Sequence, residues 1–518
     1  MSNIEIGLTG VAILFALVAM RVPIAFALIA VSFAGLWIVG GERAAWGTLS
    51  LVPYTFAATW TMSSIPMFLM MGYICFASGL TAGLFRFARL WTSALPGGLA
   101  IASIFGAAGF AAVAGSSVAC SAAMGRIAIP EMTRYGYDAR LATGSLAVAG
   151  TLGALIPPSI LMILYGMIAQ VSIGQLFLGG AVVGLITALG YAALIVVRVT
   201  LDPSLAPRVE EEVTWRMRFA AFRDVAPIAA LIALIFGGLF GGFFTPTEAG
   251  ALGATFSTLI ALVTRSLTRS AFIDAIRETL MTTATLFIIG CGAALLIRFL
   301  ALSGAGGFLT ETVTGFGADP VMIVLGIALI YLVLGMFLEP IGAMLLTLPI
   351  VLPIVGDAGW SLIWFGVFLT KLLEVGMVTP PVGMNVFVIK GVVGDLIPLS
   401  GIFRDTFANV VDLLVNIVGA GVGPAARRLR KSSPSLRRAG PRGCPRGLRA
   451  GAARTRSGEK GTRGRAARPC RARPPPALRR REGIGGLTEG EGGVGRVFRQ
   501  VVNKLILHHS SSSTPTIF

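Results

Sequence analysis

Two adjacent prolines, Pro157 and Pro158, stand inside the long apolar stretch GTLGALIPPSILMILYG, residues 150–166. A prolyl residue has no backbone N–H and clashes with the preceding helical turn, so a pair of them interrupts a helix. In a lipid bilayer, each backbone group that such a break leaves unpaired costs several kcal/mol. The chain therefore needs a place where broken backbone is covered by protein or opens onto a hydrated cavity.

The composition shows that a membrane is the relevant environment. Of the 518 residues, 55% are hydrophobic and 13% are charged. Several apolar runs reach about 18 residues, the length that crosses a bilayer as a helix. The first run begins at Ile4 without a cationic leader region before it, so we expect it to stay in the membrane. We predict an all-α polytopic membrane protein.

The basic character of the chain is confined to its C-terminal end. The formal net charge is +18, yet residues 1–424 contain 19 Lys and Arg against 20 Asp and Glu, whereas residues 425–518 contain 23 against 4. The tail mixes Arg, Pro, Gly and Ala, which cannot build a packed core, so we predict a disordered segment over 425–518. A frame-disrupted, non-native ending and attraction to anionic lipid are the two main interpretations, and no nucleic-acid partner is expected.

The positions of histidine and cysteine exclude several kinds of site. Both histidines, His508 and His509, lie at the extreme C-terminus, and the five cysteines show no paired spacing. Residues 1–424 contain no histidine, which argues against haem ligation and excludes a His-metal site and a Ser-His protease in this range. We expect no organic cofactor, no transition metal and no enzymatic activity. Na⁺ is the one metal ion that we consider.

A second proline pattern divides the membrane part into two halves. An offset of 223 positions superposes four prolines on four others, as Pro23/Pro246, Pro130/Pro353, Pro157/Pro380 and Pro158/Pro381. We predict two inverted structural repeats, residues 1–200 and 226–424, joined by a polar linker over 201–225. Each repeat would contain one helix broken at its Pro-Pro pair, at 157–158 and 380–381. A proline kink stabilised by neighbouring helices is the simpler alternative.

Each half also contains an interrupted apolar segment ahead of its broken helix. In the first, Gly115, Ser116 and Ser117 interrupt a run of small residues. This pattern suits a re-entrant helical hairpin over about 98–130 that turns at these three residues, where hydroxyls and carbonyls could bind an ion. Close packing between helices is the alternative role of such small residues.

The same offset places Glu339 and Pro340 opposite the two serines and predicts a second hairpin over about 320–353. An ionisable group inside a membrane segment is a candidate functional residue. The alternatives for Glu339 are an ion pair with Arg298 and the capping of a half-helix N-terminus.

Six motifs resemble the large membrane subunit of tripartite ATP-independent periplasmic (TRAP) transporters: MRVPIAFAL, VAGSSVACSAAMGRIAIPEM, GALIPPSILMILYG, FTPTEAGALGA, FLEPIGAMLLTLPIVLPI and VTPPVGMNVFVIKG. The resemblance covers roughly residues 5–420. It implies a sodium-driven importer with an elevator-type mechanism in a bacterial or archaeal inner membrane. It also implies two partners: a small four-helix membrane subunit, and an extracytoplasmic binding protein that delivers an organic acid such as a C4-dicarboxylate.

The resemblance further implies two sodium sites, each where a hairpin tip meets a helix break. The first site would comprise Ser116, Ser117, Gly153, Ile156 and Pro157. The second would comprise Glu339, Pro340, Gly342, Ala343, Val378 and Thr379. The residues expected near substrate are Gly115, Pro158, Ser159, Pro380, Pro381, Gly383 and Asn385.

Three other functions can be compared with this pattern, and two of them fit it less well. A stand-alone ion-coupled carboxylate carrier would share the architecture and need no binding protein. A channel would not explain paired breaks in matched repeats. An intramembrane enzyme using Ser116 or Ser117 as nucleophile would lack a histidine base.

Overall fold

The computed structural model describes residues 2–207, 213–315 and 320–406, and in these ranges its regular structure is entirely helical. Seven of the described helices are long and apolar enough to cross a membrane, or eight if one bent pair counts as a single span. These features confirm an all-α polytopic membrane protein. The predicted tail, 425–518, and the end of the second predicted repeat, 407–424, lie outside the described residues.

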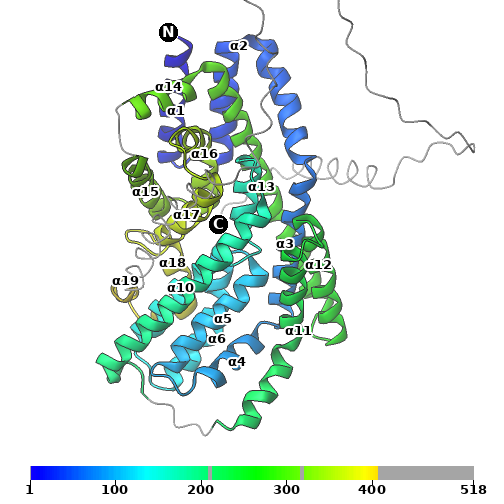
Figure 1. Ribbon diagram of the computed structural model, residues 1–518, viewed down its shortest axis with the longest axis vertical. Helices are drawn as coiled ribbons and strands as arrows, with labels where there is room; N and C mark the ends of the chain where they lie inside the picture. The colour runs from blue at the N-terminus through cyan, green and yellow to red at the C-terminus, as the bar shows by residue number, and fades with distance from the viewer. Residues whose placement is uncertain (1, 208–212, 316–319, 407–518) are drawn as a thin grey trace, which may run out of the picture. The chain divides into compact units, whose positions relative to one another are not determined.

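The first half of the chain leads from long helices into shorter, interrupted ones (Figure 1). Helix α2 bends at Gly41, whose φ of 80° lies in the left-handed region that favours glycine. The bounds are α1 (Asn3–Ala19), α2 (Ile24–Ala57), η1 (Trp60–Ser63), α3 (Ser64–Ala77), α4 (Ala82–Thr92), α5 (Gly98–Ala114), α6 (Ser117–Arg134), α7 (Ala139–Gly150), α8 (Leu152–Leu155), α9 (Ile160–Ile168), α10 (Ile173–Leu201) and η2 (Pro203–Leu205).

The second half follows a similar order. Its bounds are α11 (Trp215–Phe240), α12 (Pro246–Val263), α13 (Arg269–Ser303), α14 (Ala305–Gly315), α15 (Pro320–Phe337), α16 (Pro340–Asp357), α17 (Leu362–Gly376), α18 (Met384–Val393), η3 (Gly394–Leu396) and α19 (Leu399–Asp405).

Helix boundaries recur at the offset found in the sequence. The starts of α4, α5, α6, α7 and α9, moved by 223, fall within one residue of the starts of α14, α15, α16, α17 and α18. Helix–turn–helix pairs thus form over 98–134 and 320–357, and each is followed by a helix interrupted at its Pro-Pro pair. The inverted relation of the repeats, the re-entry of the hairpins and the elevator movement stay predictions.

The predicted linker is shorter than its composition indicates. Helix α11 begins at Trp215, inside the range 201–225, and runs without interruption to Phe240. Thr214 caps its N-terminus, and the guanidinium of Arg218 lies 4.8 Å from the ring centroid of Trp215. Arg216, Arg218 and Arg223, which fall in the predicted linker, belong instead to the first turns of a helix, where aromatic residues at helical spacing accompany them.

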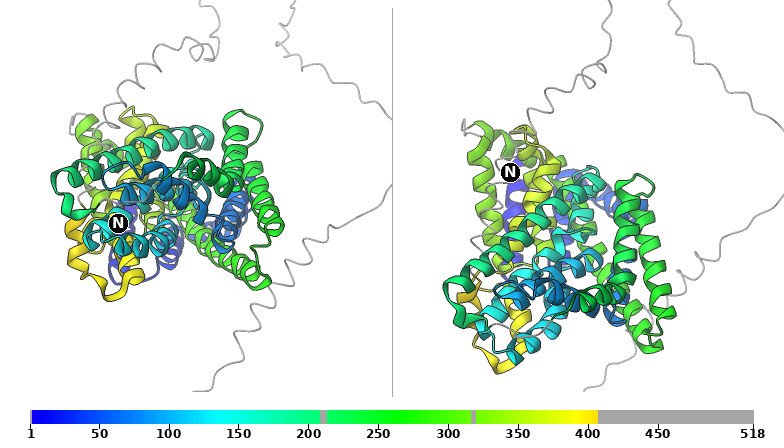
Figure 2. Two further views of the ribbon diagram at one scale, coloured as in Figure 1. Left: turned by 90° about the horizontal axis from the view of Figure 1, so that it is seen from below. Right: turned by 60° about the horizontal axis from the view of Figure 1, so that its bottom comes forward.

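Long helices surround the interrupted elements. Helix α13 packs along α2 and α3, and α11 packs against α4 and α12, as Figures 1 and 2 show. The fully buried ring of Phe299 on α13 lies against Gly10 and Gly35 of α1 and α2, where the lack of side chains leaves room for it. The hydroxyls of Tyr73 on α3 and Thr282 on α13 are hydrogen-bonded at 3.0 Å.

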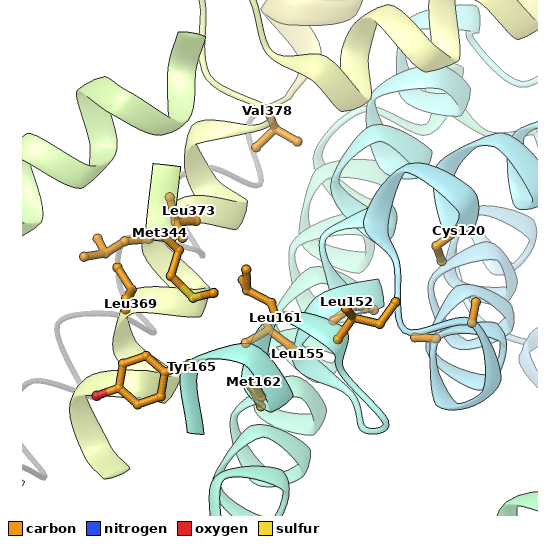
Figure 3. Packing of buried hydrophobic residues seen from close by; sticks show 14 of the residues in the cluster. Cys120, Leu152, Leu155, Leu161, Met162, Tyr165, Met344, Leu369, Leu373 and Val378 are labelled. Carbon is orange, nitrogen blue, oxygen red and sulfur yellow. The ribbon is translucent and has the colours of Figure 1, made fainter. Parts of the chain in front are cut away.

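One apolar core joins the two broken helices. Leu155 and Leu161, on either side of the first break, belong to the same buried cluster as Leu373 of α17 (Figure 3). The hydroxyl of Tyr165 on α9 donates a 2.6 Å hydrogen bond to the carbonyl of Leu362, at the start of α17. The interrupted helices of the two halves therefore pack against each other.

Gly376→Ala tests how tightly the second half packs. The added Cβ would lie 2.6 Å from backbone atoms of Gly335, which cannot move aside as a side chain can. We expect a loss of about 1–3 kcal/mol in stability, seen as a lower apparent melting temperature of the purified protein in detergent. Gly356→Ala, which meets open space on α16, is the control and should melt like the parent. Equal melting of both variants would contradict this packing.

Candidate functional site

The tip of the first hairpin lies directly on the first helix break. Gly115 has a φ of 62°, and a Cβ there would lie 2.4 Å from the carbonyl oxygen of Pro158. A Cβ on Gly153 would lie 2.6 Å from the carbonyl oxygen of Ser116. Only glycine allows these two backbones to approach so closely. The structure therefore brings together the tip and the break that the sequence predicted as one site.

The first Pro-Pro pair leaves two carbonyls without their helical donors. Pro157 and Pro158, joined by a cis peptide bond, have no N–H to offer the carbonyls of Gly153 and Ala154, four residues earlier. In the described part of the chain, no other backbone N–H replaces them. Carbonyl oxygens that lack donors are the kind of ligand that a small hard cation prefers.

Two hydroxyls face this first site without a partner. The Oγ atoms of Ser117 and Ser121, one turn apart on α6, are buried and form no hydrogen bond among the described residues. A Cβ on Gly150 would lie 1.8 Å from the Ser121 Oγ, which places this hydroxyl against the helix before the break. Sequence reasoning missed Ser121, although its position four residues after Ser117 was a usable signal.

Ser116 and Ser159 have a different role from Ser117. Each is an N-cap residue: Ser116 Oγ accepts from the N–H of Ala119 at 3.5 Å, and Ser159 Oγ accepts from the N–H of Met162 at 3.2 Å. Both hydroxyls therefore satisfy the first turns of the helices that follow the tip and the break.

At the second tip, Glu339 caps α16. Its Oε2 accepts a 3.1 Å hydrogen bond from the N–H of Gly342, and Pro340 occupies the first helical position. A carboxylate is favourable there because the N-terminus of a helix carries partial positive charge. Of the alternatives for Glu339, the structure shows the capping role.

The second break satisfies its own backbone. The N–H of Thr379 donates to the Gly376 carbonyl, and the N–H of Asn385 donates to the Met377 carbonyl at 3.0 Å. The Thr379 hydroxyl donates to Val375 in its own helix at 2.7 Å. The Asn385 side chain is fully buried, and neither of its polar atoms has a partner among the described residues. Asn385 is therefore the residue here with unused hydrogen-bonding capacity.

Both hairpin tips line one cavity of about 830 Å³. Ala154 and Met377, one beside each break, line it as well. Five predicted residues belong to its lining: Gly115, Ser116, Ser117, Glu339 and Pro340. The remaining predicted residues lie outside it: Gly153, Ile156, Pro157, Pro158, Ser159, Gly342, Ala343, Val378, Thr379, Pro380, Pro381, Gly383 and Asn385.

Charged residues that sequence reasoning missed also line this cavity. They are Arg126 from α6, Asp274 and Glu278 from α13, and Glu374 from α17. Glu374 is 1% exposed, as is Lys371 one helical turn before it. The sequence could have identified Lys371 and Glu374 as candidates, because two ionisable residues three positions apart stand inside an apolar segment.

The buried lysine connects the second half to the first. The Nζ of Lys371 lies 5.5 Å from the ring centroid of Tyr191 on α10, and the Tyr191 hydroxyl is hydrogen-bonded to Thr151 at 3.1 Å. Thr151 stands directly before α8, which ends at the first break. A cation–π contact followed by a hydrogen bond thus links α17 to the residue that precedes α8 and the first break.

Comparison with known proteins identifies related transporters. Residues 11–425 match the family model described as the tripartite ATP-independent periplasmic transporter, DctM component. The C4-dicarboxylate TRAP transporter large permease protein DctM of Pseudomonas aeruginosa is 35% identical over 360 residues, which cover 69% of this chain and 83% of that protein. The sialic acid TRAP transporter large permease protein SiaM of Vibrio cholerae is 29% identical, with 70% and 84% covered.

Solved structures resemble the fold at lower identity. The YdaH transporter of Alcanivorax borkumensis aligns with a TM-score of 0.52 at 13% identity, covering 75% of this chain and 90% of that one. This similarity concerns the fold alone.

Because the named relatives are permeases, the expectation that the chain is not an enzyme is confirmed and the serine-nucleophile alternative is excluded.

Gly153→Ala should separate the first tip from its break. The new methyl group would occupy the space of the Ser116 carbonyl, so the tip must move. We expect a cysteine introduced at Val118, in a background without native cysteines, to react severalfold faster with a polar thiol reagent. Gly174→Ala, whose Cβ would have its nearest neighbour at 3.9 Å, is the control. An unchanged labelling rate in Gly153→Ala would show that the tip does not depend on this contact.

Proposed function

Because the chain belongs to the DctM family, the large membrane subunit of tripartite ATP-independent periplasmic transporters, we propose that it imports an organic acid with Na⁺ as the coupling ion. The family makes it a secondary transporter of organic acids. The coupling ion, the carboxylate specificity and the assembly with partners are the parts that we add.

The observation that carries the proposal is the cavity shared by the two tips. At its first tip, the unpartnered hydroxyl of Ser117 and the carbonyls of Gly153 and Ala154 form a set of oxygens suited to Na⁺. At its second tip, the Glu339 carboxylate adds negative charge beside the backbone of residues 340–343. We propose one sodium site at each tip.

The charges of the cavity favour an accompanying cation. Its described lining holds four carboxylates, at Asp274, Glu278, Glu339 and Glu374, against one cation at Arg126. An organic acid entering alone would meet net repulsion, which bound Na⁺ offsets. Substrate and sodium then stabilise the same conformation, and each raises the affinity of the other.

The proposed setting is a bacterial or archaeal inner membrane. An extracytoplasmic binding protein would deliver the substrate, and a separate small four-helix membrane subunit would support this chain. Relatives named as TRAP large permeases favour such an assembly, and the isethionate TRAP transporter permease protein DctMQ of Oleidesulfovibrio alaskensis, of which this chain covers 54%, is named as a single permease protein.

Uptake into proteoliposomes tests the proposal as a whole. The vesicles contain this chain with its small subunit and binding protein, and labelled organic acids are supplied with or without an inward sodium gradient. We expect accumulation only with all components and sodium. Equal uptake in potassium or choline would disprove sodium coupling, and uptake without the binding protein would favour a stand-alone carrier.

Ser117→Ala tests the first sodium site. Removing an unpartnered buried hydroxyl leaves the fold intact, whereas loss of an ion contact of about 1 kcal/mol raises the half-saturating sodium concentration about fivefold. The matched control is Ser103→Ala in the same hairpin, since the Ser103 hydroxyl already donates to the Ala100 carbonyl. The same sodium dependence in both variants would place the site elsewhere.

A further inference from the structure

Arg126 stands apart from the other charges of the cavity. Among the described residues that line it, Arg126 is the only cation, and the described part of the chain offers it no ion pair within 4 Å. Its side chain is exposed to the cavity on α6. A guanidinium with free donors is suited to bidentate binding of a carboxylate.

The position of Arg126 is far from the first tip. Val118, Ala122 and Arg126 form a stripe along α6, four residues apart, that faces the cavity. Arg126 comes nine positions after Ser117, so their Cα atoms are about 13 Å apart along the helix axis at 1.5 Å per residue. Asp274 and Glu278 line the cavity from α13, so acidic side chains share its lining with the arginine.

Apolar side chains form most of the wall between these charges. Phe76 and Phe110, whose ring centroids lie 6.4 Å apart, line the cavity together with Leu69, Leu161 and Leu286. Such a wall favours an uncharged hydrophobic body over a second charged group.

We propose that Arg126 binds the carboxylate of a mono-anionic organic acid whose apolar body lies along this wall. Arg126 is thus a specificity-determining residue of the transport that we propose above, on which this inference rests. A dicarboxylate would place its second carboxylate without a cationic side chain, because the described lining holds four carboxylates and no cation besides Arg126.

Equilibrium binding to the full chain in lipid nanodiscs tests this specificity. The probe is labelled 4-phenylbutyrate at saturating sodium, with empty nanodiscs as background, and unlabelled succinate and 4-phenylbutyramide are the competitors. We expect saturable binding of the probe, at least tenfold weaker competition by succinate and similarly weak competition by the uncharged amide.

Three variants assign the binding to the guanidinium. Arg126→Gln should weaken probe binding at least tenfold and abolish the preference for the acid over the amide, a preference that a structural role would not control. Arg126→Lys should bind the probe with an affinity between those of the parent and Arg126→Gln, because lysine keeps the positive charge but cannot form the bidentate hydrogen bonds. Arg134→Gln, later on the same helix and outside the cavity lining, should bind like the parent.

The outcomes separate this inference from the proposed function. Three results would each overturn the role of Arg126. They are the absence of saturable probe binding, competition by succinate as strong as that by unlabelled probe, and an unchanged preference for the acid over the amide in Arg126→Gln. A melting temperature equal to that of the parent shows that a variant is folded. If Arg126→Gln does not fold, the probe affinity and acid preference of Arg126→Lys provide the test. Failure of the proposed function instead appears as absence of sodium-driven uptake by the unmodified chain.

Discussion

The contact between a hairpin tip and a broken helix is the constraint on which the rest of the structure depends. A proline pair inside an apolar segment removes donors from two carbonyls, and lipid cannot replace them. At the first break, Gly115 and Gly153 let the tip reach the exposed backbone directly. The long helix α10 packs against α8 and α9 on either side of this break, and Ala154 beside the break lines a cavity walled by protein.

Charge placement follows from the same requirement. Inside a membrane protein a carboxylate is expensive unless a helix terminus, a cation or water accompanies it. Glu339 caps α16, and Glu374 lies one turn from Lys371 on α17. Glu339 therefore has a structural role as a helix cap, and both carboxylates line the cavity, where the sodium that we propose would offset their charge. At Glu339, the carboxylate that stabilises the helix N-terminus is thus also a group that we propose for sodium binding.

Much of the fold could be predicted because proline and glycine act locally. The breaks at 157–158 and 380–381 and the turns at Ser116 and Glu339 follow from backbone chemistry that a sequence displays directly. Arg126, Asp274 and Glu278 could not be placed in the cavity, because only tertiary packing brings residues of α6 and α13 to the walls of one cavity. The start of α11 at Trp215 was also missed, since a polar stretch can equally form a loop or the first turns of a helix.

The two breaks share their position in the sequence but not their backbone bonding. In the second, Thr379 and Asn385 supply N–H groups to the carbonyls of Gly376 and Met377; in the first, the carbonyls of Gly153 and Ala154 receive none from the described backbone. A repeat that duplicates helix boundaries therefore does not duplicate ligands. The first break offers bare oxygens beside unpartnered serine hydroxyls, whereas the second offers a carboxylate at its tip. The sodium sites that we propose at the two tips would accordingly rest on different chemistry, with neutral oxygens at one and a carboxylate at the other.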